Sequence, residues 1–327
     1  MTGEYSIRIK NRDVDFRFTV RRNITIVRGD SATGKTTLYD MVVALTQNGP
    51  ESGVQLSSDK PCVALIHADM QTQIAQLKNI RDSIVFVDEG DRLVVRKEFA
   101  ETIRKTDNYY VLFIRDNLHD LPYSVEEIYE IRKSGKYHRF VNYYSKSDGY
   151  VYGRQGKKFQ FDTILTEDSK SGYQFFDAFC KDTDWRCESA QSKTQIYKWI
   201  KDHPTERVFI VADGAAFGPE MNRVMELVER NGNKAVICLP ESFEWMILKS
   251  GVVKSDDLNE VMAAPGKYID SKEYFSWEQF FTKYLIKITK DSPYSKYSKS
   301  RLSKYYMLEK NSGDIAAVIM LDNHYRN

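Results

Sequence analysis

The sequence predicts an α/β protein with two domains, and three observations lead to this prediction. Short apolar runs of the kind found in buried strands alternate with amphipathic segments of helical length along most of the chain. A chain of 327 residues, 42% hydrophobic and 29% charged, is long enough for two domains of ordinary size. The alternation also begins anew near Phe161. We therefore expect one domain over 1–157 and a second over 158–327.

Bulk composition restricts the class of protein. The formal net charge of +2 is nearly balanced and by itself indicates neither a nucleic-acid nor a membrane partner. The four cysteines contain no C-x-x-C pair, which favours reduced thiols over a zinc site. The N-terminal residues lack the apolar core of a signal peptide, and no apolar run approaches the length of a membrane span. These features predict a cytoplasmic protein without a membrane partner.

The first domain opens with a predicted β-hairpin followed by a strand, a loop and a helix. Apolar and polar residues alternate over 5–10 and 14–20, on either side of a short polar turn. Ile24–Arg28 reads as a buried strand, and Thr37–Leu45 as a helix. Between them, GDSATGKT over Gly29–Thr36 fits the pattern G-x-x-x-x-G-K-[ST]. The alternative is a chance glycine-rich turn before a helix.

This strand–loop–helix order indicates a phosphate-binding site for ATP or GTP. Backbone N–H groups of the loop and the positive helix end surround a β-phosphate, while the glycines keep side chains away from it. Lys35 reaches the β- and γ-phosphates and assists catalysis, and the Thr36 hydroxyl ligates Mg²⁺. The residues expected to hold the nucleotide are Gly29, Asp30, Ser31, Ala32, Thr33, Gly34, Lys35, Thr36 and Thr37.

A second stretch supplies carboxylates for the same site. Ile84–Val87 is a four-residue apolar strand that ends in Asp88 and Glu89. It resembles the Walker B element of P-loop NTPases, just as the loop resembles their Walker A element. That resemblance implies that Asp88 faces the Mg²⁺ held by Thr36 and that Glu89 polarises the attacking water. A strand ending in a solvated acidic turn is the alternative.

The hairpin before the loop resembles the heads of ATP-binding-cassette and recombination-type ATPases. A Ser-Gly-Gly-type signature, which the cassette family carries before the Walker B strand, is missing. Cassette-type dimerisation is therefore not implied. The remaining elements expected in this domain are a loop over 47–60, strands over 62–66 and 109–115, helices over 70–79 and 99–105, and a Ser124-capped helix over 121–131.

The second half predicts a parallel sheet with flanking helices and a helical C-terminal cap. Strands are expected over 163–166, 186–190, 208–212 and 235–239, and helices over 173–180, 193–201 and 220–231. From Tyr274 the chain is rich in tyrosine and in lysine, at positions 283, 287, 290, 296, 299 and 304. Such residues contact nucleic acid in some proteins and form the solvated face of a helical cap in others.

This order of strands resembles a Toprim domain, the metal-dependent fold of topoisomerases, primases and nucleases of the overcoming-lysogenization-defect type. Glu167 matches the glutamate that ends the first strand of the family, and Asp213 matches the first aspartate of its Asp-x-Asp motif. Glu244, or alternatively Glu241, matches a glutamate that follows the next strand. The resemblance implies that Glu167, Asp213 and Glu244 bind Mg²⁺ beside a phosphodiester.

Taken together, these patterns predict a P-loop NTPase domain coupled to a Toprim-like, Mg²⁺-dependent nuclease domain. The architecture resembles, in reduced form, ATPase-plus-Toprim nucleases of phage defence and mobile elements. Ala215 stands where the family has its second aspartate, and this favours two alternatives: an NTP-gated binding module with an inactive Toprim-like domain, or an ATPase that acts on a protein partner. Nucleic acid, a protein effector and a second copy of the chain remain open as partners besides the nucleotide.

Overall fold

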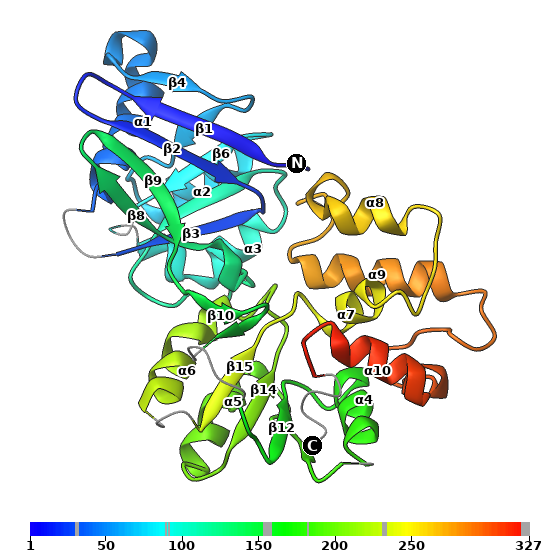
Figure 1. The fold of residues 1–327 in the computed structure, drawn as a ribbon. Helices are drawn as coiled ribbons and strands as arrows, with labels where there is room; N and C mark the ends of the chain where they lie inside the picture. Colours follow the sequence, from blue (N-terminus) through cyan, green and yellow to red (C-terminus); the bar gives the residue numbers. More distant parts are fainter. Residues whose placement is uncertain are drawn as a thin grey trace. The chain divides into compact units, whose positions relative to one another are not determined.

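The chain folds into two compact units, each with its own sheet (Figure 1). The computed structural model describes residues 1–29, 33–88, 90, 92–152, 159–181, 183–230 and 234–321. Unit 1 comprises Met1–Tyr144 and Ala264–Ser276, and unit 2 comprises Ser145–Ala263 and Trp277–Asn327. Both are α/β, as predicted. The predicted boundary between residues 157 and 158 lies outside the described residues.

Unit 1 is built on a nine-stranded mixed sheet in the order β4-β1-β2-β9-β8-β3-β7-β6-β5. Strands β8, β3, β7, β6 and β5 are parallel neighbours, whereas β1 pairs antiparallel with both β2 and β4. The strands are β1 Tyr5–Lys10, β2 Asp15–Val20, β3 Ile24–Arg28, β4 Gln55–Ser57, β5 Cys62–Ala64, β6 Ile84–Val87, β7 Tyr109–Phe113, β8 Ile128–Ser134 and β9 Tyr137–Asn142.

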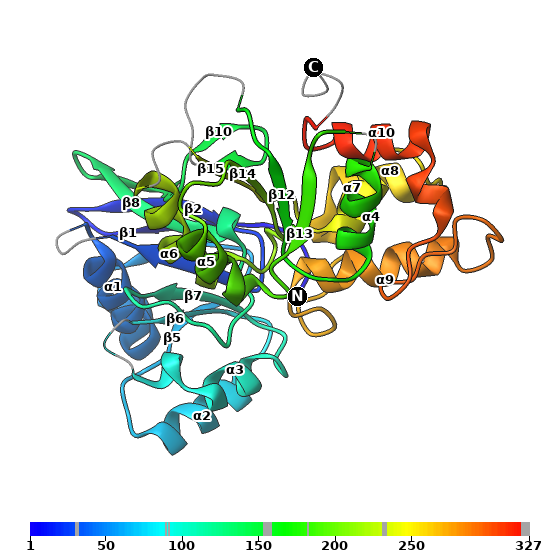
Figure 2. The same ribbon diagram turned by 90° about the horizontal axis from the view of Figure 1, so that it is seen from below.

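Helices cover both faces of this sheet (Figure 2). The helices are α1 Lys35–Asn48, α2 Met70–Asn79 and α3 Lys97–Ile103. One apolar core contains Leu38 and Val42 of α1, and the other contains Leu77 of α2 and Phe99 of α3. All residues of β3, β6 and β7 are buried, which explains why their sequences read as continuous apolar runs.

Two predictions for unit 1 are wrong. The segment predicted as a helix over 121–131 forms only a 3₁₀ turn, Val125–Glu127, and continues as β8. The Ser124 side chain does cap, accepting a hydrogen bond from the N–H of Glu126, but pairing of β8 with β3 and β9 prevails over the helical pattern. The predicted loop over 47–60 also contains β4, a short edge strand whose residues are half-buried or exposed.

Unit 2 is built on a six-stranded sheet in the order β10-β11-β15-β14-β12-β13. Its central strands β15, β14, β12 and β13 are parallel, as predicted, and β11 joins β15 in antiparallel fashion. The strands are β10 Lys146–Asp148, β11 Val151–Tyr152, β12 Thr163–Thr166, β13 Arg186–Ser189, β14 Val208–Val211 and β15 Ala235–Cys238.

Helix α4 lies on one face of this sheet, and α5 and α6 lie on the other (Figure 2). The flanking helices are α4 Ser171–Cys180, α5 Lys193–Asp202 and α6 Gly218–Arg230. The C-terminal cap is helical, as predicted, and contains α7 Phe243–Lys249, α8 Leu258–Ala263, α9 Trp277–Thr289 and α10 Glu309–Ala317. Helix α7 is almost entirely buried because the other cap helices, α8, α9 and α10, pack against it.

Candidate functional site

The predicted nucleotide loop leaves the buried strand β3 and enters α1. Gly29 and Gly34 have φ angles of 129° and 103°, in the left-handed region that glycine adopts without strain. A Cβ atom on Gly34 would also lie 3.3 Å from His138. The residues 30–32, Asp30, Ser31 and Ala32, lie outside the described residues. The two ends of the loop therefore have the conformation for which the motif needs glycine.

Lys35 is the first residue of α1, and its position suits an anion-binding role. Its side chain is buried, and its Nζ donates a hydrogen bond to the carbonyl oxygen of Gly29, so the ammonium is folded back over the loop. Thr36 and Thr37 follow in the first helical turn and are exposed. A helix start carries N–H groups without intrahelical partners and a partial positive charge, both of which attract a phosphate.

Asp88 lies at the same edge of the sheet as the loop. Strand β6, which ends just before it, and β3 are both parallel to the intervening strand β7, so their carboxyl ends share one edge. Two strand spacings, roughly 10 Å, separate β3 from β6. The Asp88 carboxylate is partly exposed and lies 3.9 Å from Nε2 of His67, a neighbour that the sequence did not indicate. Glu89 lies outside the described residues.

The donors at this edge suit Mg²⁺ only together with a nucleotide. Thr36 offers a hydroxyl and Asp88 a carboxylate, and Mg²⁺ is typically held by one or two such oxygens plus substrate phosphates and water. Among the described residues, no group of three histidine, cysteine, aspartate or glutamate side chains is placed to hold a metal ion.

A second site lies at the centre of the sheet of unit 2. Strand β12 lies between β13 and β14 in the sheet. The chain leaves β12 for β13 on one side of it and then crosses over to β14 on its other side. The connections after β12 and before β14 therefore lead in opposite directions. Ligands of open α/β sheets bind in the crevice at such a switch point, beyond the carboxyl ends of the strands. Glu167 follows β12 directly, and Asp213 lies two residues beyond the end of β14.

The structure brings the three predicted carboxylates to one small cavity. Glu167, Asp213 and Glu244 all line it, and its volume is about 30 Å³. Glu167 Oε2 accepts a hydrogen bond of 2.9 Å from the Asp213 N–H, and Asp213 Oδ1 accepts one of 3.2 Å from the Phe243 N–H. This volume suffices for a water molecule or a bare ion and excludes a nucleotide.

Lys299 also lines this cavity, and the sequence did not reveal it. Its Nζ lies 2.8 Å from Oε1 of Glu278 and 3.7 Å from Oε1 of Glu244. Lys299 is one of the six C-terminal lysines that we considered for nucleic-acid contact, yet its ammonium is engaged by carboxylates. Glu244 is 1% exposed, and the hydroxyl of Tyr297 donates a 2.6 Å hydrogen bond to its Oε1.

Burial and mutual repulsion raise the pKa values of two acids in this cavity, Asp213 and Glu167. Burial, followed by the charges of Glu278, Glu167 and Glu244, raises the pKa of Asp213 well above its usual range. Burial likewise raises the pKa of Glu167 to about 7. Burial lowers the pKa of Lys299, but the neighbouring carboxylates of Glu244, Asp213 and Glu278 outweigh it and raise that pKa overall. Lys299 therefore remains an ammonium at neutral pH.

The raised pKa of Glu167 predicts that unit 2 loses stability as pH rises. Because its folded pKa of about 7 exceeds the ordinary value of 4.5, folded Glu167 keeps a proton that the unfolded chain releases between these pH values. We expect the free energy of unfolding to fall by on the order of 2 kcal/mol from pH 5 to pH 7.5. Glu167→Gln should flatten this change. Urea unfolding followed by tryptophan fluorescence measures it, because all four tryptophans lie in unit 2.

The matched control for this measurement is Glu226→Gln, which removes an exposed carboxylate from α6 of the same unit. This variant should keep the wild-type pH dependence. Equal pH slopes for Glu167→Gln and wild type would show that Glu167 is not the group that takes up the proton.

The residues of the second cavity do not fit a divalent metal as they stand. None of its carboxylates belongs to a group of three that could hold a metal, within the described ranges. Ala215 is buried and offers no side-chain ligand, while its N–H donates to the carbonyl of Glu241. Gly214 holds the adjoining chain close, since a Cβ there would lie 2.7 Å from the carbonyl oxygen of Leu239. The backbone at Gly214 is therefore packed so closely against that of Leu239 that a side chain at position 214 has no room.

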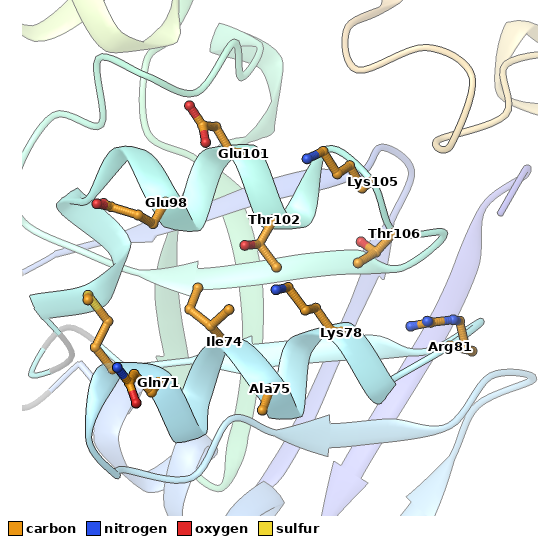
Figure 3. Close-up of a pocket in the computed structure, with 11 residues that line it drawn as sticks. Gln71, Ile74, Ala75, Lys78, Arg81, Glu98, Glu101, Thr102, Lys105 and Thr106 are labelled. Atoms are coloured by element: carbon orange, nitrogen blue, oxygen red, sulfur yellow. The ribbon is translucent and has the colours of Figure 1, made fainter.

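A further cavity, of about 820 Å³, is a groove between α2 and α3 (Figure 3). Ile74 and Ala75 contribute apolar surface to it. Glu98 and Glu101 lie along α3, whereas Lys78, Arg81 and Lys105 lie toward the C-terminal ends of α2 and α3. Helix dipoles favour acids at helix starts and bases at helix ends, so this distribution of charge needs no bound ligand to explain it. None of the predicted site residues lines this groove.

Neither the protein-family models nor the curated protein sequences produce a match. Within the part of the chain that the structure describes, every helix is too short or too polar to cross a lipid bilayer.

Proposed function

We propose that unit 1 binds and hydrolyses ATP or GTP as a P-loop NTPase. The observation that carries this proposal is the arrangement at one sheet edge: β3 leads through Gly29 and Gly34 into α1, with Lys35 over the loop and Asp88 two strands away. Phosphates bind the loop and the start of α1, and Thr36 and Asp88 would hold a Mg²⁺ ion, which would supply positive charge to stabilise the reacting phosphate oxygens. Glu89 orients the attacking water.

Replacing Asp88 tests the metal half of this site. Asp88→Asn removes the carboxylate charge while keeping the size of the side chain, so affinity for the nucleotide in Mg²⁺ should fall by about tenfold, equivalent to about 1.4 kcal/mol. Affinity in EDTA should not change. Isothermal titration with ATP and with GTP, each with and without Mg²⁺, measures both effects and identifies the preferred base.

Asp40→Asn serves as the control, because Asp40 is an exposed acid on α1. It should bind Mg²⁺–nucleotide as wild type does. If Asp88→Asn retained the full Mg²⁺ effect, the metal would have to be held by another carboxylate.

For unit 2 we infer a Toprim-like domain that acts as an NTP-gated binding module. Glu167 and Asp213 at the switch point favour the Toprim-like assignment, and their convergence with Glu244 is what a nuclease needs. Lys299 and Ala215 favour the binding module, because a tethered ammonium already neutralises the carboxylates and the second aspartate is missing.

Incubation of the full chain with single- and double-stranded nucleic acid, ATP and Mn²⁺ separates the two roles. We expect no cleavage above that of Asp213→Ala. Metal-dependent cleavage that disappears in Asp213→Ala would instead establish the nuclease.

A further inference from the structure

We propose that the groove between α2 and α3 is an interface between two copies of this chain, with α2 of each copy seated in the groove of the other. The groove is formed entirely by residues of unit 1 (Figure 3). It contains none of the residues that we assign to the nucleotide or to the acidic cavity of unit 2. The proposal therefore goes beyond the proposed function and does not rest on it.

Helix α2 leaves apolar surface exposed along this groove. Only two of its ten residues, Gln73 and Leu77, are buried, although the helix covers one face of a sheet (Figure 2). Met70 is 47% exposed, and Ile74, one turn further along α2, is half-buried. Covering such side chains with a second protein surface removes them from water and is favourable. Two turns of an α-helix, about 10 Å across and about 11 Å long, fill a volume comparable to this groove.

Charged side chains follow a fixed order along the groove. On α3, Glu98 and Glu101 precede Lys105 in the chain. Lys78 lies in the last turn of α2, and Arg81 follows that helix. Figure 3 shows α2 and α3 side by side, with the three basic side chains toward the same end of the groove. Helix dipoles account for this order, and its consequence is a groove with negative charge at one end and positive charge at the other.

A two-fold axis that crosses the groove at right angles makes two copies complementary in charge. Rotation about this axis sets the helices of the second copy antiparallel to those of the first, so the acids of each copy face the bases of the other. Such an interface is isologous, because the same surface serves both copies and the assembly closes at two chains. The opposite orientation would place like charges together, so the charges select one register.

The charges of the groove are accessible to a second chain. Among the described residues, Glu98, Lys78 and Lys105 form no ion pair. Glu101 Oε1 lies 3.7 Å from Lys97 Nζ, but both side chains are well exposed, and ion pairs of this kind contribute little to stability. Exchanging this pair for one with a partner chain therefore costs little.

Charge reversal tests the interface by sedimentation velocity of the full-length chain without nucleotide. We expect the unaltered chain to form dimers. Glu98→Lys/Glu101→Lys should associate at least about tenfold more weakly, because every charge that it places in the groove is positive. Lys78→Glu/Lys105→Glu should weaken association similarly, because its groove is mostly negative. An equimolar mixture of the two variants should restore dimers, since a positive groove then faces a negative one.

The matched control is Asp40→Lys/Glu51→Lys, which makes the same change of charge at exposed residues outside the groove. It should form dimers as the unaltered chain does. Ala75→Cys provides a second measurement, because Ala75 is exposed and lines the groove where we expect the axis to cross. A short bismaleimide should join two Ala75→Cys chains but not two chains with Asn48→Cys, an exposed position at the end of α1.

Three results overturn the proposal. The unaltered chain stays monomeric at about 0.1 mM protein, the mixture of charge-reversed variants fails to restore dimers, or dimers persist in each variant alone and so use another surface. Circular dichroism verifies folding of each variant, and dimers that form only in the mixture show independently that both variants are folded. These measurements involve no nucleotide, so failure of the P-loop assignment is recognised separately.

Discussion

Lys35→Ala is expected to weaken binding of Mg²⁺–ATP or Mg²⁺–GTP by about 100-fold or more. Removing one partner of a desolvated charge pair typically costs about 2–5 kcal/mol, and Lys35 is the buried cation that we propose to contact the β- and γ-phosphates. Its ammonium donates a hydrogen bond to the Gly29 carbonyl. Titration of a fluorescent nucleotide analogue, with circular dichroism to verify folding, measures the effect.

Lys97→Ala provides a close control for this substitution. Lys97 is the first residue of α3, as Lys35 is the first residue of α1, but it is exposed and lies at a helix that no predicted phosphate contact involves. It should bind nucleotide with wild-type affinity. Equal affinity of wild type and a folded Lys35→Ala chain would refute the assignment of the phosphate loop.

Glu89→Gln is expected to reduce turnover by about 10²–10⁴-fold while nucleotide affinity persists. The substitution preserves size and hydrogen bonding but removes the basic carboxylate that we assign to the attacking water. The assignment follows from chain position, because Glu89 comes directly after Asp88 at the end of β6, although Glu89 itself lies outside the described residues. Single-turnover hydrolysis of radiolabelled nucleotide measures the chemical step apart from product release.

Glu98→Gln, an exposed acid on α3, is the control for general effects of charge on turnover. It should hydrolyse nucleotide at the wild-type rate. If the Glu89→Gln chain had unchanged turnover, another residue at this edge of the sheet would have to orient the attacking water. Asn117, which follows β7, would be poorly placed to take this role, because its side chain already accepts a hydrogen bond from Arg28.

Helices and strands whose apolar residues repeat with the period of their buried face could be predicted from the sequence. Strand β6, strand β12 and helix α2 have the predicted bounds, because their apolar residues follow the period of the structure they form. The segment over 121–131 could not be predicted in this way. Its apolar residues satisfy a helical period and a strand period alike, and pairing with β3 and β9 decides between them.

Some residues of the candidate site in unit 2 could be predicted from the sequence, and others could not. Glu167 and Asp213 were predictable because both follow apolar strands whose ends share an edge. Glu278 and Lys299 were not, since Glu278 lies on a cap helix and Lys299 resembles the other lysines among the tyrosines of that region. Tertiary packing of the cap, which no local pattern encodes, selects Lys299 and leaves Lys296 in solvent.

The division of unit 1 into two segments imposes an order on its biosynthesis. Residues 264–276 belong to unit 1, where the carbonyl of Phe275 accepts a hydrogen bond from the Asn23 side chain and the Phe275 ring lies 4.9 Å from the Arg104 guanidinium. The ribosome makes these residues only after Ser145–Ala263, and chains fold as they emerge. The apolar core that contains Phe275 therefore stays incomplete until most of unit 2 has been synthesised. A prematurely terminated chain would release a unit 1 that lacks part of its own core.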